Sequence, residues 1–146
     1  MNYILKFLVF FEWSMSEFVL TSTTVGNGSE AGNEAAASYT NGVNTQVKCK
    51  GFTYDVTMTG DYTTLYRGVI FWYVDTSTNI KSIVRERNYV PTEYGGSGQA
   101  YNDYNYGNDT GTVTFTSEKT INLHVFAYRP LQNSGSNGIT VTISAF

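Results

Sequence analysis

LYRGVIFWYV, residues 65–74, is the longest apolar run in the body of this chain. It is rich in aromatic and β-branched residues, which favour strands over helices. It is bounded by polar residues on both sides and is short for a buried helix. A run that is apolar on both faces is typical of a strand covered on both sides. We therefore expect residues 65–74 to form a central strand.

Further predicted strands follow this run. Ile80 to Asn88 comes after Asp75-Thr-Ser-Thr-Asn79, whose composition is typical of a hairpin turn. Three later segments, 112–116, 121–128 and 139–145, alternate cleanly between apolar and polar residues. The alternation predicts a core that includes Phe71, Leu123, Val125, Val141 and Ile143, with Ile70 and Trp72 on the opposite face of their strand.

A change of phase marks the segment before the central strand. Val47 and Cys49 are the apolar members of one alternating set, but after Gly51 the apolar set shifts to Phe52, Tyr54, Val56 and Met58. A phase change at a glycine predicts a β-bulge or a sharp bend. Because Cys49 belongs to the alternating set, we expect a small core residue rather than a nucleophile.

These segments define the expected fold. About seven to nine strands and no sustained helical periodicity predict one all-β domain over residues 46–146, a single β-sandwich or jelly-roll-like body. In architecture this pattern is similar to viral coat, phage fibre and surface-appendage subunits. The resemblance covers the body only and carries no functional residues with it.

Residues 1–13, MNYILKFLVFFEW, are dense in large apolar side chains. Lys6 and Glu12 leave only Phe7 to Phe11 uninterrupted, which is too short for a membrane span or a secretory signal. A strand is the remaining interpretation, with one wholly apolar or aromatic face formed by Tyr3, Leu5, Phe7, Val9, Phe11 and Trp13. Such a strand is either the first strand of the domain's own core or an arm that pairs with a neighbouring subunit. Met15 is an alternative start of the chain.

Residues 26–45 separate the apolar region, residues 1–25, from the body. Gly, Asn, Ser and Ala dominate this stretch, and large apolar side chains are almost absent. It is therefore predicted to be a flexible polar linker or a long loop. An apolar strand followed by a tether suits exchange of the strand between copies, and it equally suits a loop that crosses between sheets.

The composition restricts the classes of partner and the location that we expect for this protein. Charged residues make up 14% of the chain and the net charge is −3, so the basic patch that nucleic-acid binding requires is not expected. Low charge, abundant Thr and Tyr, and glycosylation sequons at Asn27 and Asn108 fit an extracellular, cell-surface or virion protein.

Catalysis and metal binding find little support. His124 is the only histidine, which excludes a site built from several imidazoles. No nucleophile elbow or phosphate loop is present, and the spacing of Asp103, Asn105 and Asp109 does not match a calcium loop. We predict no catalytic, cofactor-binding or metal-binding residues, no cofactor and no enzymatic activity.

Residues 89–111 form a second notable segment, with five tyrosines among Gly, Asn and Asp. Tyrosine offers a large amphipathic contact area, and the small polar residues offer adaptable hydrogen bonds. The segment is either a ligand-binding loop or a contact with a neighbouring subunit, with candidate residues Tyr94, Tyr101, Asp103, Tyr104, Asn105 and Tyr106.

Together these patterns predict a non-enzymatic structural subunit that assembles with copies of itself through the N-terminal strand arm. The structure built in this way would be a filament, appendage, capsid or fibre component. The alternative is a carbohydrate-binding, lectin-like module that uses residues 89–111 and has glycans as partners.

Overall fold

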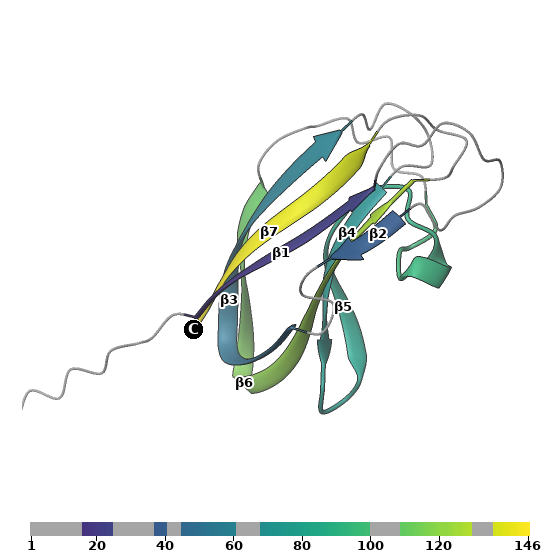
Figure 1. Cartoon of the computed structure of the whole chain (residues 1–146). Helices are drawn as coiled ribbons and strands as arrows, with labels where there is room; N and C mark the ends of the chain where they lie inside the picture. The colour runs from purple at the N-terminus through teal and green to yellow at the C-terminus, as the bar shows by residue number, and fades with distance from the viewer. Residues whose placement is uncertain (1–15, 25–36, 41–44, 61–67, 100–108, 130–135) are drawn as a thin grey trace, which may run out of the picture.

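The protein is an antiparallel β-structure (Figure 1). The computed structural model describes residues 16–24, 37–40, 45–60, 68–99, 109–129 and 136–146. Within these ranges the chain forms seven strands and one short 3-10 turn, η2, and no α-helix. The strands are β1 (Ser16–Thr24), β2 (Ala37–Thr40), β3 (Thr45–Gly60), β4 (Gly68–Asp75), β5 (Ile80–Asn88), β6 (Asp109–Tyr128) and β7 (Asn137–Ala145); η2 is Thr92–Tyr94. The predicted all-β class is confirmed.

All seven strands belong to one hydrogen-bonded sheet in the order β2-β1-β7-β3-β6-β4-β5. Every pairing is antiparallel. The sequence predicts a sandwich or jelly roll, which would have two packed sheets. The structure instead connects the strands into a single sheet, so the finer classification stays a prediction.

The sheet bends where the sequence predicts it. Cys49 of β3 lies opposite Lys119 of β6, but Gly51 lies opposite Thr114, so β6 carries extra residues at this point. A Cβ on Gly51 would lie only 2.4 Å from the carbonyl oxygen of Val113 and 2.7 Å from the Phe146 ring. Only glycine fits this close approach without a shift of the backbone. The predicted bulge or bend at Gly51 is confirmed.

The bend brings distant strands face to face. Ser22 of β1 accepts a 3.0 Å hydrogen bond at Oγ from the backbone N–H of Ala127 in β6, although β7 and β3 separate these strands in the sheet. Near the same end, the buried Asn137 of β7 donates from its amide to the carbonyl oxygens of Gly68 and Tyr128 and bonds with Thr24. These buried bonds tie both halves of the bent sheet together.

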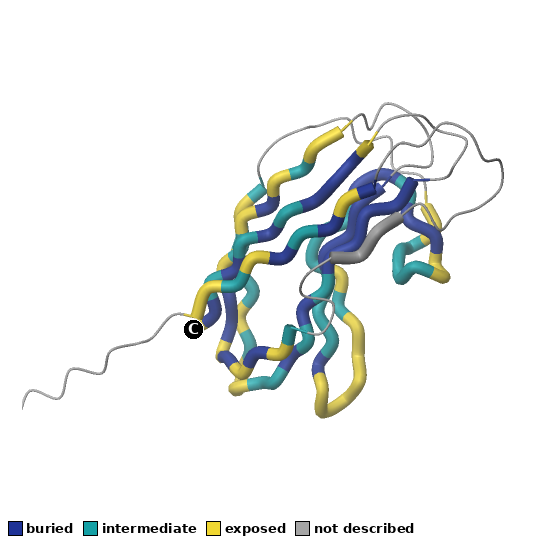
Figure 2. The backbone as a smooth tube through the Cα atoms, in the orientation of Figure 1, coloured by how far each residue is buried: buried dark blue, intermediate teal, exposed yellow. Residues whose placement is uncertain are grey.

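The core lies between these halves. Figure 2 shows buried residues alternating with more exposed ones along β1, β3 and β7. The five predicted core residues are all fully buried: Phe71, Leu123, Val125, Val141 and Ile143. Cys49 is also buried in this core. Ile70 and Trp72 pack in a separate cluster on the other face of β4, as the alternation predicts.

The predicted hairpin is also confirmed. β5 has the bounds that the sequence predicts, and residues 76–79 form the turn between β4 and β5. Asn79 has a φ of 56° and donates a 2.7 Å hydrogen bond from its backbone to Asp75. Asparagine tolerates this left-handed conformation better than most residues. In contrast, segments 112–116 and 121–128, predicted as two strands, are one long strand, β6, because the chain stays extended through the bend.

The N-terminal region is described only in part. β1 pairs along its whole length with β7 and is therefore part of the body's sheet. Within residues 26–45, where the sequence predicts a linker or long loop, Ala37–Thr40 forms β2 and pairs with Thr21–Thr24. Residues 1–15 lie outside the described ranges, and so does the predicted arm, Tyr3 to Trp13.

Replacing Leu123 with alanine should destabilise the fold by about 2 to 5 kcal/mol, because the substitution leaves a cavity in a fully buried site. Urea unfolding at equilibrium measures this loss. Thr112→Ala, on the exposed face of β6, is the control and should change stability by less than about 0.5 kcal/mol. A similarly small effect of Leu123→Ala would contradict the assigned core.

Candidate functional site

Of the residues predicted for the ligand or contact loop, the structure describes Tyr94; Tyr101, Asp103, Tyr104, Asn105 and Tyr106 lie outside the described ranges. Tyr94 ends the short turn η2. Its ring stacks on Phe126 at a centroid distance of 5.2 Å and an interplanar angle of 15°, and it lies 5.5 Å from the Tyr128 ring. Tyr94 therefore covers the apolar outer face of β6, with its ring face against protein.

The backbone around Tyr94 is held in place by hydrogen bonds. Ser97 donates from its N–H and its hydroxyl to Glu86 of β5 at 2.9 and 3.1 Å. Gly95 follows η2 with a φ of 90°, a conformation that glycine adopts without strain. Residues 89–99 are thus a fixed cover over the outer face of β4 and β6.

Beside this cover, three side chains form a layered contact. The Trp72 and His124 rings are stacked at 4.9 Å and 6°, and the ammonium group of Lys81 lies 4.6 Å from the Trp72 ring. Burial, and then the nearby Lys81 charge, lower the pKa of His124. Burial also lowers the pKa of Lys81. The sequence predicts an outward or partly buried histidine here, and His124 is partly buried.

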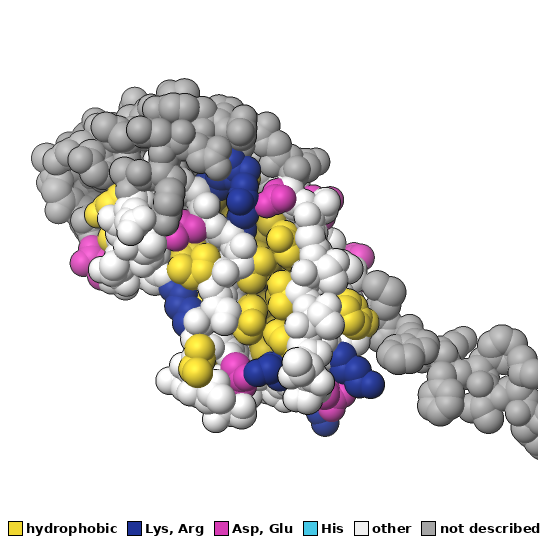
Figure 3. Space-filling view, turned by 180° about the vertical axis from the view of Figure 1, so that it is seen from behind, with side chains coloured by type: hydrophobic (Ala, Val, Ile, Leu, Met, Phe, Trp, Pro, Cys, Tyr) yellow, Lys and Arg dark blue, Asp and Glu magenta, His cyan; other side chains and the backbone are white. Residues whose placement is uncertain are grey.

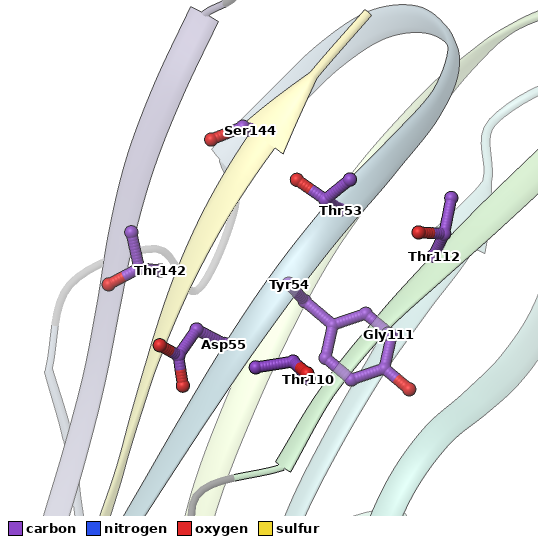
Figure 4. Close-up of a pocket in the computed structure, with 8 residues that line it drawn as sticks. All are labelled: Thr53, Tyr54, Asp55, Thr110, Gly111, Thr112, Thr142 and Ser144. Carbon is purple, nitrogen blue, oxygen red and sulfur yellow. The ribbon is translucent and has the colours of Figure 1, made fainter.

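A second feature is an open, hydroxyl-rich groove of about 380 Å³ on the outer face of β7, β3 and β6 (Figure 4). Two rows of directly opposed residues cross it: Ser144, Thr53 and Thr112, and then Thr142, Asp55 and Thr110. Tyr54 and Gly111 complete the lining. Asp55 is the only charged residue among the described residues that line the groove. The groove offers hydrogen-bond donors and acceptors with one carboxylate, which suits a polar, hydroxylated ligand better than an anion.

Sequence reasoning missed this groove. The signal was the alternation of threonine with other residues in 110–116 and 140–144, which places hydroxyls on one face of a strand. The strand pairing places β6 and β7 on either side of β3, and this arrangement brings their hydroxyls into common rows. The sequence pattern of a single strand does not contain this information.

The third feature is an apolar surface between β5 and the first half of β6, which we call the lateral strip (Figure 3). Tyr73 of β4 and Phe115 of β6 are in contact there, with ring centroids 5.5 Å apart. Phe52 and Phe71 pack beneath them in the core. The strip consists of partly buried side chains packed against the core: Tyr54, Tyr73, Val84, Val113 and Phe115.

An ion pair crosses each end of the lateral strip. At one end, Arg85 Nε of β5 lies 2.7 Å from Asp109 Oδ2 of β6, although its N–H is not aligned for a hydrogen bond. At the other end, Lys119 Nζ lies 2.5 Å from Asp75 Oδ2. Ser77 donates from its backbone and its hydroxyl to Asp75 Oδ1. The bond with Lys119 is the largest cause, and the bonds with Ser77 the next largest, of a pKa of Asp75 that lies well below its usual range. Asp75 in turn raises the pKa of Lys119.

Reactive groups are sparse in the described ranges. No cluster of three or more His, Cys, Asp or Glu side chains that could hold a metal ion occurs there. Burial raises the pKa of the Cys49 thiol, which disfavours the reactive thiolate. No helix in these ranges is long and apolar enough to cross a membrane.

Comparison with known proteins identifies no relative. No family model, no curated protein and no solved structure matches the chain. The class that the structure defines is therefore architectural: an all-β protein with a single bent antiparallel sheet.

Replacing Asp75 with asparagine should lower stability at neutral pH and have a smaller effect in acid. The native pKa of Asp75 is lowered, so its carboxylate stabilises the fold above the unfolded pKa of about 3.9, and this contribution is lost as pH falls through the lowered native value. Urea unfolding of both proteins from pH 7 down to about pH 2.5 measures the difference. Asp55→Asn, on the exposed face of β3, is the control. A difference that grows toward acid would contradict this role of Asp75.

Proposed function

We propose that the protein is a non-enzymatic structural subunit that assembles with copies of itself into an extracellular, cell-surface or virion structure. Its body is a jelly-roll-like sandwich, and its connector is the apolar arm with Tyr3, Leu5, Phe7, Val9, Phe11 and Trp13 on one face. The observation that carries this proposal is that the described part of the body leaves apolar side chains partly uncovered, in a chain whose sequence also contains this apolar segment.

Two further properties of the body support self-assembly. The sheet has open edges: in the described ranges β5 pairs only with β4, and β2 covers only Thr21–Thr24 of β1. An open strand edge accepts a further strand through main-chain hydrogen bonds. Low charge favours association as well, because subunits of net charge −3 repel each other weakly.

Replacing Phe7 and Phe11 with aspartate in the full-length chain should abolish assembly. Burial of a large apolar side chain contributes roughly 1.5 to 3 kcal/mol, and aspartate would have to be desolvated at the same contact. Light scattering and negative-stain microscopy measure assembly, and circular dichroism checks the fold. Ser29→Asp with Asn33→Asp adds the same charge in the polar segment and should leave assembly intact. Deletion of residues 1–14 should yield a folded monomer.

The proposal fails on either of two results. One is a full-length protein that stays monomeric at high concentration. The other is a Phe7→Asp/Phe11→Asp variant that assembles as well as the unchanged chain.

The second candidate is a carbohydrate-binding module, which the hydroxyl-rich groove favours. Sugar hydroxyls both donate and accept hydrogen bonds, so rows of threonine hydroxyls beside one carboxylate suit them. The sequence-based version of this function places the ligand on residues 89–111 instead. Tyr94 gives that version little support, because its ring packs against Phe126 and Tyr128.

A glycan array separates the two functions. If the groove binds sugars, the protein should bind reproducibly and Asp55→Ala should remove the signal while assembly persists. If loop 89–111 is the site, Tyr104→Ala should remove it. Thr116→Ala, on the same face of β6 but outside the groove, is the matched control. An array without any signal would leave the structural role as the better account.

A further inference from the structure

We infer that the lateral strip is the acceptor for the N-terminal arm of a second copy, which pairs as an added strand with the free edge of β6 between Asp109 and Thr116. This inference rests on the proposed function and specifies its receiving surface. It accounts for two features together, an unpartnered strand edge and the apolar side chains beside it.

The edge of β6 is suited to strand addition. Residues 109–114 pair with β3 on one side, and no strand in the described ranges pairs with residues 109–116 on the other side, since β4 begins its pairing at Ile121. The sequence DTGTVTFT, residues 109–116, has the β-branched and aromatic composition that favours strands. Its backbone N–H and C=O groups can therefore extend the sheet by one strand.

The side chains beside this edge match the arm. A strand added to β6 would present every second residue to the partly buried Tyr73, Val84 and Phe115. The arm face that begins at Tyr3 and ends at Trp13 is free of charge and would cover them. The opposite face, which carries Lys6 and Glu12, would point outward beside the threonines of β6.

β5, the other edge of the strip, is a poorer acceptor. Its pairing with β4 shifts register between Phe71 and Trp72, so the strand contains a bulge. It also carries Lys81, Arg85 and Glu86. Bulges and charged side chains are the devices that keep an edge strand from pairing. Among residues 110–116 of β6 there is no charged side chain.

The order of strands favours a second copy over the same chain. The arm precedes Ser16 of β1, and β7 and β3 lie between β1 and β6 in the sheet. An arm of the same chain would first have to cross the ends of two strands. Donor arm and acceptor strip are also different surfaces, so the contact is heterologous and repeats from copy to copy, giving a filament or a closed ring.

Disulfide trapping between full-length chains tests this inference. One chain carries Leu8→Cys, on the outward face of the arm. The second carries Thr110→Cys, Thr112→Cys or Thr114→Cys, so that three pairing registers of the added strand are tested. Directly opposed residues on antiparallel strands lie about 4.5 to 5.5 Å apart, within the range of disulfides. The only natural cysteine, Cys49, is buried. Oxidised mixtures are resolved on non-reducing gels.

We expect a cross-linked dimer of Leu8→Cys with at least one of the three β6 variants. Val19→Cys on the exposed part of β1 and Lys81→Cys on β5 are matched controls and should cross-link little. Preferred coupling to Val19→Cys or Lys81→Cys would place the arm on another edge. That result would overturn this inference and leave the proposed function standing.

Two further outcomes also count against the inference. A chain with both Leu8→Cys and Thr112→Cys that closes its disulfide internally, without dimer, would show that the arm covers its own strip. Absence of any coupling, while Phe7→Asp/Phe11→Asp still blocks assembly, would mean that the arm binds a surface other than β6. Absence of coupling from a monomeric protein would overturn the proposed function as well.

Discussion

The bend at Gly51 is the constraint on which the rest of the structure depends. A side chain there would collide with the carbonyl of Val113 and the ring of Phe146, so the close passage of β3 over β6 requires glycine. Because both strands continue through the bend, a single sheet can enclose a core from two sides. Phe52, which comes directly after the bend, contacts the rings of Phe71, Tyr73 and Phe115. The bend thus positions the aromatic centre of the molecule.

A bent single sheet leaves edges that do not close on each other. β5 and the first half of β6 border the core without a described strand between them, and the ion pairs Arg85–Asp109 and Asp75–Lys119 span the ends of this opening. Charged side chains that point inward at sheet edges oppose unwanted pairing. They also restrict where a new strand can enter. The same geometry leaves Tyr73 and Phe115 partly uncovered, beside the strand edge where we propose that the arm of a second copy pairs.

The described surfaces carry chemistry suited to recognition. Hydroxyls dominate the groove on β7, β3 and β6, and apolar side chains are partly uncovered in the lateral strip, whereas residues 89–99 cover the rings on the outer face of β4 and β6. The bond between Asp75 and Lys119 is the main cause of the shifted pKa values of these two groups. Burial is the main cause of the shifted pKa values of Cys49, Lys81 and His124.

The sequence by itself determined the features that arise from local patterns. The turn composition of residues 75–79 identified β5, alternation identified β7 and the core residues Leu123 and Val141, and the phase change located the bend, because each of these signals lies in neighbouring residues. It did not reveal β2, whose four residues are too few for a pattern. Only the tertiary structure decided which strands pair, and hence the stacking of Trp72 on His124 and the bond between Asp75 and Lys119, 44 residues apart. Such contacts depend on strand order, which single-strand periodicity does not encode.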